Sequence, residues 1–258
     1  MTYPAFPGKH ALQAMVTPER MLAHRRSGGR LAQIAPPRGA VISLERGLPE
    51  RMRRRVRIRQ VGRLMGDLYE VRATSGRVLV LTGFGLGAPI VAAQAEELIA
   101  LGATHLVSVA LAGGLQPDLA PGTIVVSQSA IRDEGTSHHY LPPARTVCAD
   151  PSLTASLVAA LSGAGAVVRA GRSWSTDAPY RESADEVNAY QAQGVLAVDM
   201  EVAALFAVAQ ARGVAAAAVL VVGDNLSGGE WRPPQRLDAM RAALDLAYRV
   251  AVEVLDAA

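Results

Sequence analysis

Two acidic residues stand where apolar runs end, in positions that suit the binding of a sugar and the donation of a proton. Glu201 follows Met200 in the segment Val-Asp-Met-Glu, and Asp224 ends the run Val-Val-Gly-Asp. A carboxylate such as Glu201 can accept hydrogen bonds from both hydroxyls of a sugar while Met200 packs against the ring. Asp224 can donate a proton if its surroundings are partly desolvated. The alternative for both acids is a structural role at a helix start or a turn.

Two glycine-rich loops each follow a predicted strand. Residues 83–89 (GFGLGAP) come directly after the run RVLVLT and open a helix, and residues 112–117 (AGGLQP) end the next strand. Exposed backbone N–H groups and the helix dipole can bind an anion at such a place, and two loops side by side would form an anion pocket. No acidic residue follows at the distance that a dinucleotide site requires, and plain tight turns are the alternative.

Composition excludes several other classes. The formal net charge of +3 is too small to make nucleic acid or an anionic membrane the expected partner. The single cysteine, Cys148, rules out an intrachain disulfide framework and fits a reducing compartment, so we expect a cytoplasmic protein. His138 and His139 lack further cysteines or histidines in register, so we expect a polar loop there and no metal site. The prolines and glycine among the first ten residues do not fit a signal peptide, and no apolar run is long enough to span a membrane.

The elements that must position these residues alternate between strand and helix. Residues 1–39 read as an irregular N-terminal arm with one short helix over 18–26, capped by Thr17, and residues 40–258 read as one α/β domain. We expect strands at 40–44, 68–74, 77–82, 105–110, 122–127, 166–172, 195–198 and 215–222, and helices at 89–101, 151–162, 184–193, 201–212 and 236–255. Such alternation predicts a central mixed, mainly parallel sheet covered by helices, with the site at the carboxyl ends of the strands.

The stretch from about residue 78 to 231 resembles the nucleoside phosphorylase superfamily, of the uridine phosphorylase and hexameric purine nucleoside phosphorylase type. The matching segments stand in that family's order and spacing: GFGLGAP (83–89), AGGLQPDLAPGTIVV (112–126), IRDEGTS (131–137), WSTDAPYRES (174–183), VDMEVAALFAVA (198–209) and VVGDN (221–225). The resemblance implies a nucleoside phosphorylase-like fold. It also implies reversible phosphorolysis, in which phosphate attacks the anomeric carbon as the base leaves.

The resemblance assigns roles around the nucleoside. Met200 and Glu201 match the ribose-binding pair, with Glu201 on the 2′ and 3′ hydroxyls, and Asp224 matches the acid that protonates a departing purine. The resemblance implies base contacts from Tyr180, Arg181 and Trp174, of which Arg181 takes the place of an arginine that grips a pyrimidine carbonyl. The resemblance also implies that His10 takes the place of a family histidine that reaches the 5′-hydroxyl of the nucleoside bound in the neighbouring subunit. Asp224 thus indicates purines and Arg181 indicates uridine, so the base preference stays open.

The phosphate site matches the family least well. The family's loop Gly-Asp-Pro-x-Arg is approximated by residues 47–51, which makes Gly47 and Arg51 candidate phosphate ligands beside Gly85, and a neighbouring subunit could lend Arg59 or Arg63. Before the AGGL loop the family has an Arg and, two and three positions on, a Gly and a Thr or Ser. Here those places hold Ser108, Ala110 and Leu111. Neither Ser108 nor Leu111 replaces a charge-assisted arginine fork.

Three hypotheses follow. The first is phosphorolysis of a uridine or purine nucleoside by a pentosyltransferase of nucleoside salvage, a homohexamer (trimer of dimers) or homodimer with inorganic phosphate as co-substrate and no metal or organic cofactor. The second is a phosphate-independent nucleosidase, motivated by Ser108 and Leu111. The third is a catalytically weak nucleoside-binding homo-oligomer, in which an arginine-rich stretch could touch polyanions. That stretch contains one acid, Glu50, and Arg46, Arg51, Arg53, Arg54, Arg55, Arg57, Arg59 and Arg63.

Overall fold

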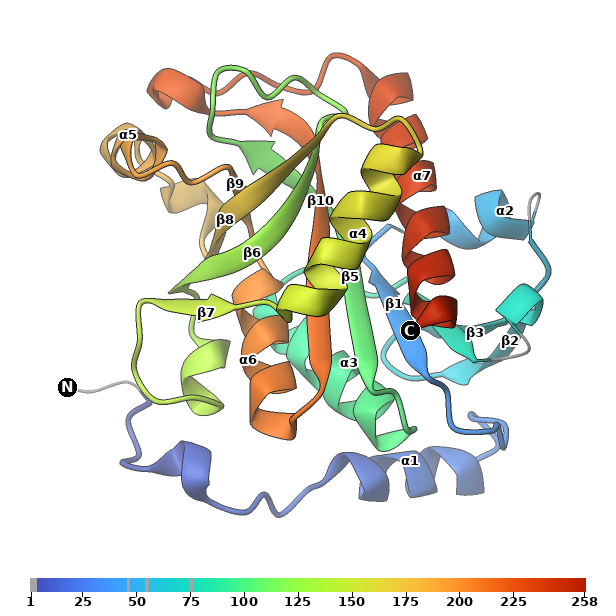
Figure 1. The fold of residues 1–258 in the computed structure, drawn as a ribbon. Coiled ribbons are helices and arrows are strands. Elements are labelled where there is room, and N and C mark those ends of the chain that lie inside the picture. Colours follow the sequence, from blue (N-terminus) through green and yellow to red (C-terminus); the bar gives the residue numbers. More distant parts are fainter. Residues whose placement is uncertain (1–3, 46, 54–55, 75–76) are drawn as a thin grey trace.

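One twisted, mixed sheet organises the chain, with helices on both of its faces (Figure 1). The computed structural model describes residues 4–45, 47–53, 56–74 and 77–258, so Arg46, Arg54 and Arg55 of the arginine-rich stretch lie outside the described residues. The strands are β1 (Gly39–Ser43), β2 (Ile58–Arg63), β3 (Asp67–Val71), β4 (Val78–Thr82), β5 (His105–Gly114), β6 (Ile124–Asp133), β7 (Thr146–Cys148), β8 (Val168–Thr176), β9 (Ala197–Asp199) and β10 (Ala215–Asn225).

The strands follow the order β10-β6-β8-β9-β5-β1-β4-β3-β2, and β7 pairs with β6. Strand β10 also pairs with β5, so β5, β10, β6, β8 and β9 form a closed circuit of neighbours. The long pairings β10–β5 and β6–β8 and those of β1 with β4 and β5 are parallel, whereas β6–β10, β5–β9 and the β2–β3–β4 meander are antiparallel. The sheet is therefore mixed, as predicted.

Two apolar cores fill the two faces of the sheet. The helices α3 (Ala88–Ala100) and α6 (Val202–Arg212) pack together on one face, with Phe206 in that core. The helices α4 (Pro151–Gly163) and α7 (Leu237–Ala257) cover the other face, with Leu157 and Leu244 inside. A third cluster around Trp174 lies under α5 (Ala184–Ala192). Central strands such as β4 and β10 are buried on both faces, which explains why they read as continuous apolar runs.

The N-terminal arm runs along the lower edge of the molecule in Figure 1. Its helix α1 (Pro18–Ser27) begins after Thr17, whose hydroxyl accepts a hydrogen bond from the backbone N–H of Arg20. Arg25 of α1 forms an ion pair of 2.9 Å with Glu97 of α3, and Leu22 packs into the core beside α3 and α6. The described part of the arm is thus attached to the α/β domain by both polar and apolar contacts.

Several elements escape the sequence pattern. The short helix α2 (Leu48–Arg53) and the strands β2 and β7 were not expected, and β5, β6 and β10 run several residues beyond their predicted ends. Strand β2 reads Ile-Arg-Gln-Val-Gly-Arg and lies at the end of the sheet, where polar side chains are tolerated and the apolar alternation is weak. Among the described residues, none of the helices combines the length and the apolar character that a membrane crossing needs.

Candidate active site

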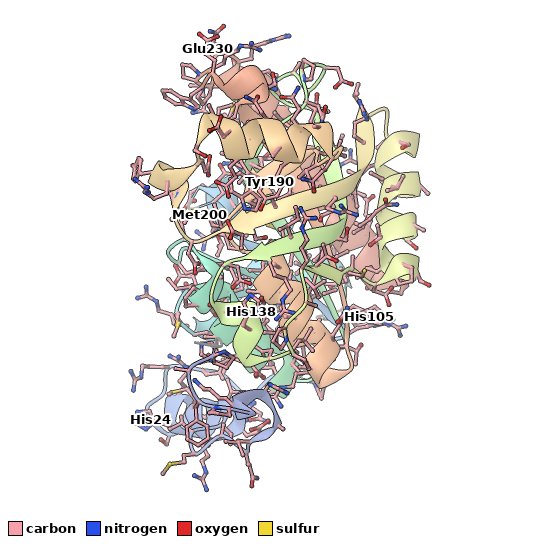
Figure 2. The ribbon with its side chains drawn as sticks, turned by 90° about the vertical axis from the view of Figure 1, so that its left-hand side faces the viewer. His24, His105, His138, Tyr190, Met200 and Glu230 are labelled. Atoms are coloured by element: carbon pink, nitrogen blue, oxygen red, sulfur yellow. The ribbon has the colours of Figure 1, made fainter. Side chains whose placement is uncertain are left out.

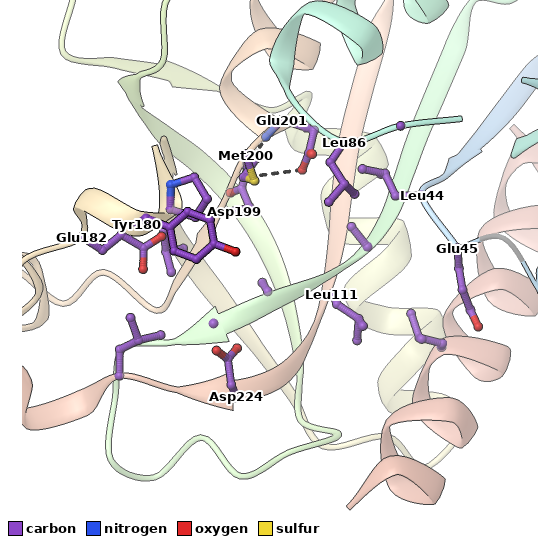
Figure 3. Close-up of a pocket in the computed structure, with 18 of the residues that line it drawn as sticks. Leu44, Glu45, Leu86, Leu111, Tyr180, Glu182, Asp199, Met200, Glu201 and Asp224 are labelled. Carbon is purple, nitrogen blue, oxygen red and sulfur yellow. Dashed lines mark hydrogen bonds between the residues drawn. The ribbon is translucent and has the colours of Figure 1, made fainter. Parts of the chain in front are cut away.

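A cavity of about 960 Å³ opens at the carboxyl ends of the strands, where Figure 3 shows the residues around it. Its walls come from the segments after β1, β4 and β8, from the ends of β5, β9 and β10, and from one side of α7. The lining includes Leu44, Glu45, Gly85, Leu86, Ala110, Leu111, Tyr180, Glu182, Asp199, Met200, Glu201, Asp224, Trp231, Leu244 and Tyr248. The site therefore lies where a sheet of this kind is expected to hold one.

The turn between β9 and α6 is fixed by Asp199. One oxygen of its carboxylate accepts hydrogen bonds of 2.8 Å from the backbone N–H groups of Glu201 and Val202 and from the Ser175 hydroxyl. Asp199 thus satisfies N–H groups at the start of α6, the work of a capping residue. The aspartate in this motif has a structural task, and its neighbours Met200 and Glu201 are left to face the cavity.

Glu201 is held between two backbone groups. Its Oε1 accepts a hydrogen bond of 2.7 Å from the N–H of Gly87, and its Oε2 accepts one of 3.2 Å from the N–H of Met200. Burial and the nearby Asp199 raise the pKa of Glu201 to about 7. A carboxylate this well oriented and this poorly solvated can accept hydrogen bonds from the hydroxyls of a bound sugar.

The first glycine-rich loop serves Glu201. Gly87 has φ of +106°, a conformation that side chains rarely adopt, and in it the backbone N–H points at the carboxylate. The N–H of Gly87, predicted to belong to an anion pocket, is therefore engaged by a carboxylate of the protein itself. Gly85 lines the cavity as expected, and nothing in the structure tests whether it binds phosphate.

Asp224 reaches the cavity from the end of β10. The pairing of β10 with β5 shifts register between Val222 and Asp224, so Gly223 is an extra residue in the strand. Such a bulge re-aims the side chain that follows it, and Asp224 leaves the core-facing row to which Val222 belongs. Its Oδ2 accepts a hydrogen bond of 2.7 Å from the indole N–H of Trp231, which also lines the cavity. The orientation of the Asp224 carboxylate is therefore fixed by Trp231, a residue that lies outside β10.

The second glycine-rich loop packs against the end of β10. A Cβ on Gly113 would lie 2.5 Å from Leu226 and 3.0 Å from Val198, so only glycine fits. The amide of Asn225 donates hydrogen bonds of 2.9 and 3.1 Å to the backbone carbonyls of Gln116 and Leu119. These contacts hold the AGGL loop and the Asp224 segment together. A Cβ on Gly114 would lie 2.9 Å from the amide nitrogen of Asn225, so this close packing also explains the second glycine.

Glu182 is a cavity residue that the sequence interpretation passed over. It follows the short 3₁₀ turn Pro179–Arg181, is half-buried and lines the cavity with Asp224. Burial and the negative charges of Asp224 and Glu186 raise the pKa of Glu182 to about 7. Its place one residue after Arg181, inside a motif already singled out, was the available signal.

Of the three residues predicted to contact the base, only one lines the cavity. Tyr180 lines the cavity mouth and is fully exposed. Trp174 is 0% exposed, its ring lies 4.8 Å from that of Tyr190, and its N–H donates to Asp133, so it is a core residue, which corrects its expected place in the base pocket. Arg181 is exposed and absent from the lining, because the turn directs the next residue, Glu182, inward instead.

Most of the predicted phosphate ligands do not line the cavity. Arg51 does not line the cavity; its guanidinium donates two hydrogen bonds of 2.6 and 2.5 Å to Glu45 and one of 2.7 Å to Asp245. Gly47 is exposed and also outside the lining. Ser108 is buried in the middle of β5, whereas Leu111 lines the cavity and is 47% exposed. Among the residues that the structure describes, no lysine, arginine or histidine lines this cavity.

The remaining candidates lie apart from the cavity. His10 is exposed in the N-terminal arm, and Figure 2 shows His24, His105 and His138 dispersed over the molecule, away from Met200. Arg59 and Arg63 on β2 form ion pairs of 2.9 Å with Glu70 and Asp67. In the part of the chain that the structure describes, no cluster of three His, Cys, Asp or Glu residues is arranged to hold a metal ion.

Comparison with known proteins decides the family. The model of the phosphorylase superfamily matches residues 47–256, which is most of the chain. The protein belongs to the phosphorylase superfamily. Within the superfamily, this member is 35% identical to the uridine phosphorylase of Treponema pallidum over 66% of this chain and 69% of that one. It is 32% identical to the guanosine phosphorylase of Halorubrum lacusprofundi over 60% of this chain and 64% of the relative.

Solved structures of the superfamily share the fold. The crystal structure of uridine phosphorylase from Vibrio fischeri ES114 matches with a TM-score of 0.72 and 24% identity, covering 95% of this chain and 99% of the other. Among the relatives compared by sequence, the DeoD-type purine nucleoside phosphorylase of Bacillus cytotoxicus is 29% identical over 69% of this chain and 77% of its own length. The predicted resemblance and the predicted α/β fold are confirmed.

Proposed function

We propose that this superfamily member is a pentosyltransferase that cleaves the N-glycosidic bond of nucleosides by phosphorolysis. The observation that carries the proposal is the convergence of Met200, Glu201 and Asp224 on one cavity, from the ends of two different strands. Relatives named uridine, guanosine and purine nucleoside phosphorylases support the same chemistry. No metal or organic cofactor takes part in this reaction, and inorganic phosphate is the co-substrate.

The reaction breaks the bond between the anomeric carbon and the base and forms a bond to a phosphate oxygen. The electron pair of the broken bond stays with the base, and a proton from Asp224 neutralises the charge that develops on a purine. Glu201 accepts hydrogen bonds from the 2′ and 3′ hydroxyls and fixes the sugar, while Met200 packs against it. The products are a pentose 1-phosphate and the free base. Hydrogen bonds that orient the sugar act by positioning, and the acid acts on the leaving group.

Phosphate enters at the end of the cavity lined by Gly85 and Leu111, close to Glu45. Arg51 is a candidate cation from the chain's own fold, since it contacts Glu45, which lines the cavity. Arg59 and Arg63 remain candidates from a second copy in a homohexamer or homodimer, which we propose as the working assembly in the cytoplasm. The hydrolytic alternative has no support among these relatives, which are all named phosphorylases.

The test is release of free base, measured by chromatography after incubation with uridine, inosine, guanosine and adenosine, each with and without phosphate. We expect release that requires phosphate and yields one pentose 1-phosphate per base. Release at the same rate without phosphate would overturn the proposal in favour of hydrolysis. Absence of release from every nucleoside, with or without phosphate, would also overturn it.

A further inference from the structure

The base end of the cavity carries two carboxylates. In Figure 3, Glu182 and Asp224 lie toward the side away from Leu44 and Glu45, with Tyr180 next to Glu182. Asp224 accepts a hydrogen bond from the indole N–H of Trp231. Glu182 is positioned between the turn Pro179–Arg181 and Ser183, which caps α5. The described residues around the cavity include no basic side chain that would neutralise Glu182. A ligand at this end must therefore supply hydrogen-bond donors itself.

The edges of the common bases differ in the donors that they offer to a carboxylate. Guanine presents two parallel donors, its ring N1–H and its 2-amino group, which match the two oxygens of one carboxylate. Hypoxanthine presents N1–H alone. Uracil presents one N–H between two carbonyl oxygens, and those oxygens repel a carboxylate. Adenine presents a ring nitrogen that accepts and an amino group that donates, so an ionised carboxylate meets a lone pair.

We propose that Glu182 is the specificity-determining residue of the site and that it selects guanine by accepting hydrogen bonds from N1–H and the 2-amino group. This inference rests on the proposed cleavage of nucleosides. The two acids then act on different edges of one purine: Asp224 serves the imidazole ring that must be protonated, and Glu182 reads the six-membered ring. Asp224 and Glu182 line the same cavity, as this arrangement requires. The exposed Arg181 has no part in it.

The pKa of Glu182 agrees with this role. Burial and the charges of Asp224 and Glu186 raise it to about 7, so the carboxyl is ready to be stabilised in its ionised form by donors from a ligand. Two N–H donors arriving together provide that stabilisation. A base without them leaves a poorly solvated carboxylate unpaired, which is the stronger source of discrimination.

The experiment compares kcat/KM for guanosine, inosine, uridine and adenosine in the wild type and in Glu182→Gln. A glutamine has nearly the same shape but offers one acceptor and one donor, a pattern that suits uracil and adenine and does not match the two donors, N1–H and the 2-amino group, of guanine. We expect the wild type to prefer guanosine over the other three nucleosides by about 10-fold or more, the size of a bidentate contact to a base. In Glu182→Gln we expect guanosine to lose roughly 10- to 100-fold and uridine or adenosine to gain relative to it.

Asp185→Asn is the matched control. It removes the same charge three residues further on, from the exposed start of α5 and outside the cavity lining. We expect it to keep the wild-type order of nucleosides. Equal losses for all four nucleosides in Glu182→Gln, or an unchanged order, would overturn the assignment of Glu182 while leaving the proposed phosphorolysis in place.

Absence of turnover would contradict the proposed function but would not test the role of Glu182. Equilibrium binding of the free bases tests that role without turnover. Calorimetric titration with guanine, hypoxanthine, adenine and uracil should show guanine bound most tightly by the wild type and no longer preferred by Glu182→Gln. Equal affinities for the four bases in the wild type would contradict the role of Glu182.

Discussion

The two ends of the cavity are built in opposite ways. The end that we propose for the sugar and the base is polar and preorganised: Glu201 is fixed by two backbone N–H groups, and Asp224 by the indole of Trp231. The opposite end is lined by Leu44, Leu86, Leu111 and Leu244, with Glu45 as its charged side chain. Under the proposed function, the residues of this one chain therefore suffice for the nucleoside, whereas we expect the binding of a phosphate dianion to require a rearrangement of Arg51 or an arginine from a second copy.

We expect phosphate binding to limit the reaction more than nucleoside binding does. An arginine that already satisfies two carboxylates offers less to a phosphate than a free one does, because the incoming anion must displace them. The contacts to Glu45 and Asp245 also raise the pKa of the Arg51 guanidinium above its usual value. We expect tight binding of nucleoside and weak binding of phosphate, and the following variants test that asymmetry.

The largest effect is expected at the sugar. Glu201→Gln loses charge-assisted hydrogen bonds to two hydroxyls, each worth about 1.5–3 kcal/mol, so kcat/KM should fall by roughly 10²–10⁴. Steady-state kinetics with guanosine at saturating phosphate measures the loss. Glu253→Gln, an exposed change on α7, is the control. Retention of full activity by Glu201→Gln would contradict the role of Glu201 in binding the sugar.

The next effect concerns the leaving group. Asp224→Asn cannot donate a proton, so kcat for a purine nucleoside should fall by about 10²–10³, the lower part of the range for general acid catalysis. A riboside of 4-nitrophenol needs no protonation to leave and should lose less than about tenfold in the same variant. Equal losses for both substrates would mean that Asp224 positions the nucleoside and does not protonate it.

The phosphate end should respond in the opposite direction. Glu45→Gln removes one negative charge and the two-pronged contact that occupies Arg51, so the KM for phosphate should fall by about 3- to 10-fold while the KM for nucleoside stays the same. Asp238→Asn, an exposed change on α7, is the matched control. An unchanged or increased KM for phosphate in Glu45→Gln would show that Arg51 is not the ligand and would favour arginines from a second copy.

The selectivity between guanosine and adenosine should depend on pH. Glu182 is faced by Asp224 from β10 and by Glu186 from α5, and its pKa is raised to about 7. Below pH 7 its neutral carboxyl can donate to adenine, and above pH 7 its carboxylate accepts from guanine. The ratio of kcat/KM for guanosine to that for adenosine should rise several-fold between pH 6 and 8, by roughly the fraction of Glu182 that ionises. Ionisation of Glu201 cancels in the ratio because both substrates carry the same sugar.

The last expected effect is on stability. Because the folded state raises the pKa of Glu201 from 4.5 to about 7, ionising this group costs stability as the pH rises from about 4.5 to 7, and the loss is complete above that window. Glu201→Gln cannot ionise and avoids the loss. We expect the variant to gain about 1–3 kcal/mol on the wild type between pH 5 and 8, measured by urea unfolding at both values. A constant difference at the two pH values would contradict the raised pKa.

The parts that were predictable from sequence are those in which local pattern and tertiary structure agree. Buried strands such as β4 and β10 are continuous apolar runs, and the Met200–Glu201 turn lies between a strand and a helix as expected. The role of the first glycine-rich loop was not predictable, because the N–H of Gly87 donates to Glu201, a residue distant in the chain. Three further features likewise depend on contacts between distant segments. Glu182 lines the cavity, Trp174 is buried, and Arg51 donates a hydrogen bond to Asp245.

Phosphorolysis is tested most directly by a ³¹P NMR measurement of guanosine and inorganic phosphate incubated with the wild-type protein and with Glu201→Gln. We expect the wild type to convert phosphate into ribose 1-phosphate in an amount equal to the guanine released, and the variant to do so far more slowly. Guanine released together with free ribose, while the phosphate signal stays unchanged, would contradict it.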